Sequence, residues 1–203
     1  MAEESSVAVN FDKDLADWLA LSEQAHDAYG RRKLVPAEIK FKEAIQILER
    51  VCADELHKDD AELKAKLAKS HNNLGAIYHA QGKFGLAEES YAQAMKLKVE
   101  LFGEDHFEIA PCYQNLAAVH SARVQYDKAE PLYRRAIAIK EKEYGNDSPE
   151  LLTPLKNLLM LCKKQERIAE IALLEKRIKS IEPPEVNPGD LWQSIALKSK
   201  DKQ

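Results

Sequence analysis

The Asn-Leu dipeptide recurs at a fixed spacing in this chain, at Asn73-Leu74, Asn115-Leu116 and Asn157-Leu158. The same 42-residue interval separates each copy from the next, and other positions keep this step, such as Ala87-Glu88 with Ala129-Glu130. A period of this length predicts stacked structural repeats rather than one globular core. Because a solenoid has a long side surface and no enclosed catalytic pocket, the pattern favours a binding scaffold.

The composition is that of a soluble folded chain, with 45% hydrophobic and 32% charged residues among 203. The formal net charge of −4 lacks the basic excess of a duplex DNA-binding protein, so no nucleic-acid partner is expected. Cys52, Cys112 and Cys162 are isolated and odd in number, which argues against a disulfide framework or zinc site. No secretory signal and no apolar run of about 18 residues is visible, so we expect a cytoplasmic protein without membrane insertion.

The apolar residues follow helical spacing from Asp12 to about Glu182, and each 42-residue unit contains two such stretches. The sequence therefore predicts an all-α fold, an α-solenoid of about four antiparallel helix pairs plus a short C-terminal helix. The predicted segments are a flexible N-terminal arm at 1–11, a helical repeat domain at 12–182, and a Pro-rich linker with a tail helix at 183–203. The predicted units within the repeat domain are about 12–60, 63–103, 105–145 and 148–182.

Breaks in the helical pattern fall at matching places in successive units. Inside a unit, we expect a tight turn at Gln81-Gly82-Lys83 and at its counterpart Arg123-Val124-Gln125. Between units, Gly103 and Gly145 follow helix ends, where glycine adopts a left-handed backbone at little cost. The residues expected to cap the next helix are Asp105 or His106 and Asp147 or Ser148.

Small residues recur where two helices must approach closely, and tyrosines recur where spaces between units need filling. The residues that carry this pattern in the second unit are Leu74, Gly75, Tyr78, Ala87, Tyr91 and Ala94. Their spacing resembles the tetratricopeptide repeat, and the 42-residue period resembles the long-helix subclass found in kinesin light chains. The resemblance covers the predicted repeat domain and is strongest from Lys69 to Pro149. It implies a right-handed superhelix in which the first helix of each pair lines the concave face.

The terminal units depart from this pattern. The interval from Ala44 to Ala94 is longer than the repeat period, which predicts a longer exit loop in the first unit. The last unit has Ile171, Glu175 and Ile178 where small and aromatic residues stood, as expected of a repeat that must end the stack.

The resemblance places a peptide-binding groove along the exposed positions of the first helices. The candidate groove residues are Lys69, Asn72, Asn73, His79, Gln114, Asn115, Ser121, Lys156, Asn157, Met160 and Lys163, and the first unit adds Ser22, Glu23 and His26. An Asn amide donates and accepts at once, so one Asn per unit could clamp the backbone of an extended peptide. Alternatively, Asn73, Asn115 and Asn157 hydrogen-bond between adjacent first helices and fix the superhelical twist. Lys156 and Lys163 would favour an acidic partner, or simply form a solvated face.

No residue pattern spells out catalytic chemistry. The histidines lack the helical spacing of a metal site, and neither a nucleophile motif nor a Gly-rich phosphate loop is present. We therefore expect no enzyme activity, no metal and no cofactor. His106 is expected to pack or cap at a unit junction, His79 to contact a peptide, and Cys112 and Cys162 to be buried.

The leading functional hypothesis is a non-catalytic adaptor that binds a protein or peptide partner in its concave groove. The alternative is a structural protein that self-assembles through stacked ends or through its tail. A third hypothesis is a helical repeat that binds RNA, but its only support is the basic residues Lys156, Lys163 and Arg167. In the tail, Leu191, Trp192 and Ile195 could share one helical face, which would cover the fourth unit or dock in a groove.

Overall fold

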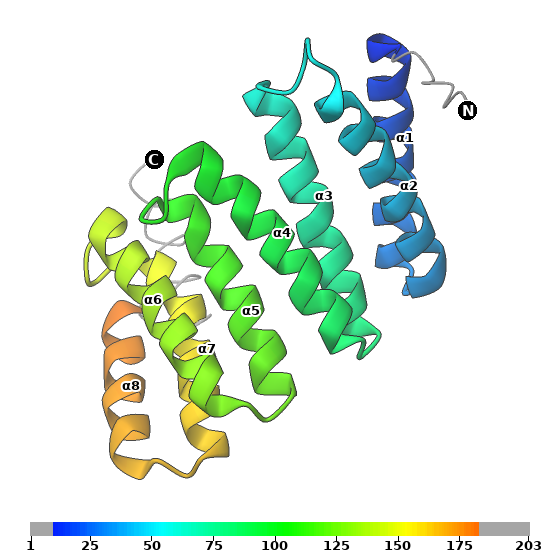
Figure 1. The fold of residues 1–203 in the computed structure, drawn as a ribbon. Helices are drawn as coiled ribbons and strands as arrows, with labels where there is room; N and C mark the ends of the chain where they lie inside the picture. The colour runs from blue at the N-terminus through cyan, green and yellow to red at the C-terminus, as the bar shows by residue number, and fades with distance from the viewer. Residues whose placement is uncertain (1–9, 183–203) are drawn as a thin grey trace, which may run out of the picture.

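Four antiparallel helix pairs stack side by side in the computed structural model, which describes residues 10–182 (Figure 1). The helices are α1 (Phe11–Gly30), α2 (Leu34–Ala53), α3 (Ala61–Ala80), α4 (Phe84–Phe102), α5 (Ala110–Ala122), α6 (Tyr126–Tyr144), α7 (Leu152–Lys164) and α8 (Ile168–Ile181). Two 3-10 turns, η1 (Phe107–Ile109) and η2 (Pro149–Leu151), precede α5 and α7. This arrangement confirms the predicted all-α solenoid. The tail prediction on Leu191, Trp192 and Ile195 lies outside the described residues.

Side-chain caps start the helices where the sequence changes unit. Asp60 accepts hydrogen bonds from the backbone N–H groups of Glu62 and Leu63 at the start of α3. The His106 imidazole and the Ser148 hydroxyl each accept a backbone N–H two residues on, and so begin η1 and η2. Of the alternative caps offered by the sequence, His106 and Ser148 are the ones used. These caps satisfy N–H groups that a helix start leaves unpaired.

The turn inside each pair has one residue with a left-handed backbone. It is glycine only in the second pair, where Gly82 has φ of 73°. The equivalent residues in the other pairs are Arg32, Val124 and Glu166, with φ of 58°, 62° and 56°. A β-branched residue such as Val124 is strained in this conformation, so the surrounding helix packing must hold the turn in place.

The core runs the length of the stack between the helix layers. One buried cluster extends from Ala25 to Val119 and a second from Ala117 to Ile181, so the two meet on α5. Gly75 confirms the expected close approach, because a Cβ atom built there would lie 2.8 Å from the Tyr91 ring. Tyr91 is only 5% exposed and belongs to the first cluster, and this burial raises the pKa of its phenol to about 12.

Ion pairs tie the turn of each pair to the second helix of the preceding pair. Lys83 lies 2.9 Å from Glu38, Arg123 lies 2.7 Å from Glu88, and Arg167 lies 2.5 Å from Glu130. Glu38, Glu88 and Glu130 are equivalent residues that each follow a buried alanine. The recurring Ala-Glu dipeptide thus places a small residue in the core and a carboxylate at the next unit.

A second repeated contact joins each unit to the loop that follows it. Lys98 donates to the backbone oxygen of Glu108 and to its carboxylate, at 3.2 and 2.9 Å. Lys140, the equivalent residue one period later, makes the same two bonds to Glu150, at 3.0 and 3.4 Å. These lysines hold the 3-10 turns against the preceding helix and so fix where α5 and α7 begin.

A matched pair of glycine substitutions tests the close approach within the second pair. We expect Gly75→Ala to destabilise the fold by about 1–3 kcal/mol, because the new methyl group must displace the Tyr91 ring. Gly85→Ala, in the first turn of α4 with nothing within 4 Å of the added carbon, is expected to stabilise it by about 0.5–1 kcal/mol. Urea unfolding followed by circular dichroism measures both, and equal effects would contradict the packing.

Acid sensitivity tests the ion pair at the last turn. The Arg167 guanidinium holds the pKa of the Glu130 carboxyl below its usual range, so the unfolded chain binds the proton more readily. The stabilisation is therefore present above the unfolded pKa of about 4.3 and is lost as pH falls through the folded value. We expect Glu130→Gln to cost about 1 kcal/mol at pH 7 and much less near pH 3. Glu143→Gln, an exposed change on the same helix, is the control, and a pH-independent cost of Glu130→Gln would contradict the linkage.

Candidate functional site

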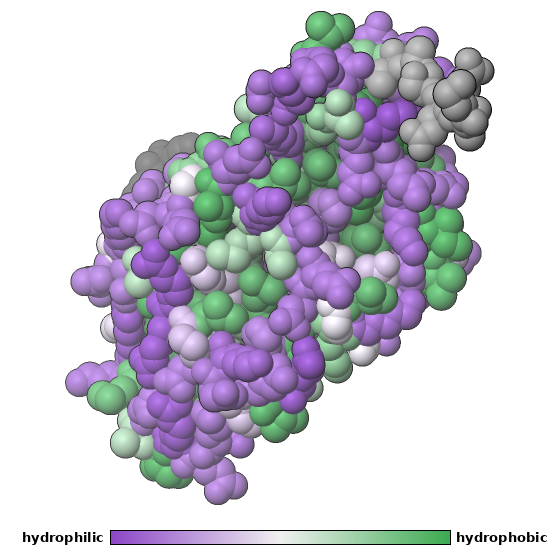
Figure 2. Space-filling model, in the orientation of Figure 1, coloured by the Kyte–Doolittle hydropathy of each residue, from purple (hydrophilic) through white to green (hydrophobic). Residues whose placement is uncertain are grey.

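The first helices of the pairs lie next to one another along one side of the stack. The α3 helix contacts α5, and α5 contacts α7. Two hydrogen bonds between α1 and α3 extend the same row to the first pair. The exposed strip of this row is the candidate groove. On the face seen in Figure 2, hydrophilic residues cover most of the helices, and hydrophobic residues show in hollows between neighbouring helices and in patches at the edges.

Two of the three repeated asparagines form bonds between adjacent first helices. The Asn115 amide donates to the side-chain oxygen of Asn72 at 2.7 Å, which joins α5 to α3. The Asn73 amide lies 3.2 Å from the His26 Nε2 atom, which joins α3 to α1. Asn73 and Asn115 therefore have the geometry of the alternative role, in which the asparagines bond between adjacent first helices and fix the superhelical twist.

The equivalent partner for Asn157 would be Gln114, which stands one period after Asn72. No such bond is seen between them within residues 10–182, and the Gln114 Nε2 atom is buried without a hydrogen-bond partner. The Nε2 atom of His79 is also buried and unpartnered, while its ring meets Phe84 edge-on. These groove candidates carry hydrogen-bonding capacity that the described protein does not use.

The predicted groove lysines of the last pair are engaged with acidic groups. Lys156 lies 2.7 Å from the Glu182 carboxylate, and Lys163 lies 2.7 Å from Glu175. All four side chains are about half exposed, so each pair contributes little to stability. The lysines therefore face acidic groups of this chain, and their charges are largely compensated. The remaining candidates Lys69 and Met160 are exposed, and Ser121 is half-buried.

A pocket of about 190 Å³ opens between α1 and α3. Its lining includes Ser22, Glu23, His26, Lys69 and Asn73, all of which the sequence placed along the groove. Sequence reasoning missed the other residues of the lining, chiefly Trp18, Phe41 and Ser70. The available signal was the position of Trp18, one helical turn before Ser22 and hence on the same helical face.

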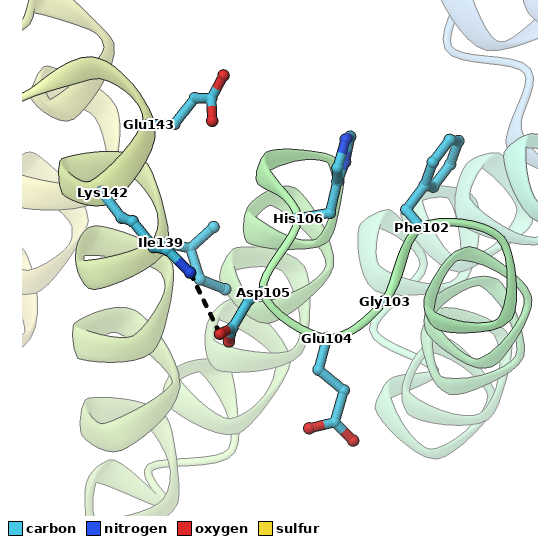
Figure 3. Close-up of a pocket in the computed structure, with 8 residues that line it drawn as sticks. All are labelled: Phe102, Gly103, Glu104, Asp105, His106, Ile139, Lys142 and Glu143. Carbon is cyan, nitrogen blue, oxygen red and sulfur yellow. Dashed lines mark hydrogen bonds and ion pairs between the residues drawn. The ribbon is translucent and has the colours of Figure 1, made fainter.

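A larger and more open recess of about 530 Å³ lies at the loop between α4 and α5 (Figure 3). In Figure 3, Asp105 points toward the Lys142 ammonium, and the rings of Phe102 and His106 lie face to face. Lys142 and Arg135 lower the pKa of the Asp105 carboxyl, so this group stays ionised near neutral pH. His106 serves as a cap, as expected, so its Nδ1 atom is already engaged with the backbone.

A third recess, of about 460 Å³, lies between α2 and α4 with α3 as its floor. The rim offers Lys42, Glu49 and Glu89, and burial lowers the pKa of the His71 imidazole at its edge. At neutral pH His71 is therefore mostly uncharged. The neighbouring carboxylate of Glu49 lies 3.8 Å away, too far for a direct hydrogen bond.

Within the part of the chain that the structure describes, no group of three or more His, Cys, Asp or Glu side chains could hold a metal ion. None of the described helices is both long and apolar enough to cross a membrane. Cys112 and Cys162 are buried, as expected, and burial raises the pKa of both thiols, which disfavours the reactive thiolate.

Comparison with known proteins agrees with this architecture. The family model of the tetratricopeptide repeat matches residues 66–142, which lie in the second and third helix pairs. Among curated proteins, none matches the sequence.

Solved structures share the fold at low sequence identity. BtubC (BKLC) from P. vanneervenii is 20% identical with a TM-score of 0.61, over 92% of this chain and 80% of that one. The apo form of RapI is 14% identical with a TM-score of 0.68, over 83% of this chain but only 43% of RapI. The nearly identical TPR-like repeats of a putative kinesin light chain from Podosopora anserina are 16% identical with a TM-score of 0.50, over 80% and 93%. The family match therefore identifies tetratricopeptide repeats within residues 66–142, and the likeness to the solved structures shows that the described helix pairs share their fold.

Proposed function

We propose that this protein is a non-catalytic adaptor that binds an extended peptide segment of a partner protein along its first helices. The supporting observation is a set of unused polar atoms on that row, namely Ser22 Oγ, His79 Nε2 and Gln114 Nε2. A buried polar group without a partner costs about 1–3 kcal/mol. A peptide backbone, with free N–H and C=O groups, would relieve that cost on binding.

The length of the groove sets the length of the segment. Four first helices at spacings of about 8–10 Å span about 24–30 Å between the outer axes. An extended chain covers about 3.3 Å per residue, so about eight residues would run from α1 to α7. An interface of this size suits a transient complex of about micromolar affinity.

The amide bonds between adjacent helices also support this function. A peptide groove must keep its shape before the ligand arrives, because ordering it on binding would reduce affinity. The Asn115–Asn72 and Asn73–His26 bonds hold three first helices at fixed spacing. The asparagines thus serve chiefly to fix the groove, and the neighbouring polar residues would contact the ligand.

We also propose that the protein works in the cytoplasm. Three free cysteines, two of them buried, suit a reducing environment such as the cytoplasm. The groove would have only a weak preference for acidic partners, because Lys156 and Lys163 are already paired with Glu182 and Glu175.

A steric block on α5 tests the groove. Peptides of about 12 residues are selected from a random display library on the immobilised full chain, and their affinities are measured by fluorescence polarisation. Ala118 of α5 stands one period before the groove candidate Met160. We expect Ala118→Arg to weaken binding at least about tenfold, because the guanidinium would occupy the path of the backbone. Ala92→Arg on α4 is the matched control, since Arg134 stands at the equivalent position one unit later.

Either of two results would contradict groove binding. One is unchanged affinity of the selected peptides for Ala118→Arg. The other is an equal loss for Ala92→Arg, which would place the peptide on the second helices instead.

A second candidate function is self-assembly by end-to-end stacking. Exposed apolar side chains gather on the two terminal pairs, at Val35 and Ile39 of α2 and at Ile168 and Leu173 of α8. Two unlike surfaces at opposite ends would form a head-to-tail contact. Because such contacts can continue as an open filament rather than a closed ring, assemblies would grow with concentration.

Light scattering from about 1 to 100 μM distinguishes this candidate, because an adaptor keeps one mass and an assembler grows. Under self-assembly, Leu173→Glu should restore a constant mass, because it would bury a charge in the contact. Leu56→Glu, the same change in the exposed loop before α3, should leave assembly intact. A constant mass for the unmodified chain rejects this second function.

A further inference from the structure

We propose that the pocket between α1 and α3 binds a phenol ring, so that the partner peptide places a tyrosine side chain there. The tyrosine as biological ligand rests on the proposed groove function. The phenol site itself rests on the geometry of four groups, namely Trp18, Ser22, Phe41 and the His26–Asn73 pair.

Two hydrogen bonds between the helices form opposite end walls of the pocket. At one end the Trp18 indole N–H donates to the Ser70 hydroxyl at 3.2 Å, and that hydroxyl donates to the backbone oxygen of Lys66. At the other end the Asn73 amide meets the His26 Nε2 atom at 3.2 Å. Trp18 and His26 lie on the same face of α1, and the walls are about two helical turns apart.

The tautomer of His26 follows from its two contacts. Its Nδ1 atom lies 2.7 Å from the backbone oxygen of Ser22, which can only accept, so Nδ1 carries the proton. The Nε2 atom is then free to accept from the Asn73 amide. The second wall is therefore a directed chain from Asn73 through His26 to the α1 backbone, and it holds the imidazole fixed.

The size and surface of the pocket suit an aromatic ring. Phe41 from α2 and the Trp18 indole give apolar surface, and His26 meets Phe41 edge-on with 5.0 Å between ring centres. An apolar cavity of about 150 Å³ accommodates benzene. The volume of about 190 Å³ leaves room for the same ring with one further polar atom.

Ser22 supplies the partner for that polar atom. It lies between the walls, one helical turn from Trp18 and one from His26, and is only 8% exposed. Its hydroxyl oxygen has no hydrogen-bond partner in the described protein. A phenol hydroxyl both donates and accepts, so it would satisfy Ser22, whereas an aliphatic side chain would leave the serine unpaired.

Along the described row of first helices, an aromatic wall of this kind occurs only between α1 and α3. The residues equivalent to Trp18 in the next two units are Ala68 and Ala110, both fully buried. Neither supplies an aromatic wall, so a ring has one place to bind along the groove. At the rim, Glu23 on α1 and Lys69 on α3 offer an acceptor and a donor to the peptide backbone on either side.

Small probes test the site directly on the full-length chain. Binding of 4-methylphenol and of toluene is measured from the NMR shift of the Trp18 indole N–H, assigned by its loss in Trp18→Phe. We expect saturable binding of 4-methylphenol at about 1–10 mM, as fits a ligand of this small size. Toluene should bind about 3- to 10-fold more weakly, because it cannot bond to Ser22.

Serine substitutions isolate the hydroxyl. Ser22→Ala should remove the preference for 4-methylphenol over toluene without unfolding the chain, because it deletes an unpaired buried oxygen. Ser90→Ala, at a buried serine of α4 outside this pocket, should keep the preference. Equal affinity for both probes in the unmodified protein, or no saturable shift of the Trp18 signal, overturns the phenol site.

The outcomes separate this inference from the proposed function. Phenol binding in a chain whose selected peptides ignore Ala118→Arg supports the site and rejects the groove. Groove peptides that lack tyrosine, together with probes that leave Trp18 unshifted, reject the phenol site and leave the groove function standing.

Discussion

The close approach of the two helices within each pair is the interaction on which the rest of the structure depends. The alanines that allow it are completely buried at two equivalent positions in three successive pairs, Ala37, Ala87 and Ala129, and Ala44, Ala94 and Ala136. When the two helices of a pair pack closely, the polar residues on the outside of that pair can bond with the next pair. Glu38, Glu88 and Glu130 can therefore reach the following turn, and the first helices come near enough for amide bonds such as Asn115–Asn72.

Apolar and polar contacts between the pairs have different structural roles. The buried apolar clusters run across successive pairs and hold the stack together, while ion pairs and amides at its surface help to set the angle and spacing between hairpins. The left-handed residue of each turn fits this division. Val124 is strained in that conformation, yet its turn carries Arg123, which pairs with Glu88 of the previous unit at 2.7 Å. The contacts of this turn therefore hold Val124 in a conformation that its own backbone disfavours.

The repeat period was enough to predict the fold, because helix spacing, turn glycines and small core residues are local signals. His106 and Ser148 were among the caps expected from the sequence. Partners across the stack could not be predicted, because they depend on the rotation between units. The sequence offered bonds between adjacent first helices as one of two roles for Asn73 and Asn115, but it left their partners open. Trp18 stands one helical turn before Ser22, but it was missed because its contact with Ser70 on α3 depends on the rotation between units.

Function in this fold follows from how equivalent positions differ. Ser22, Asn72, Gln114 and Lys156 occupy the same place in the four units, yet their surroundings are unlike. Asn72 accepts from Asn115, Lys156 pairs with Glu182, and the Ser22 hydroxyl and the Gln114 Nε2 atom are unpaired within residues 10–182. The two unpaired groups lie on α1 and α5, two helix spacings of about 8–10 Å apart. Under the proposed groove function, a ligand would gain by presenting polar atoms to both groups, about 16–20 Å apart, and to His79 on the α3 helix between them. That spacing would give a selectivity that no single repeat contains.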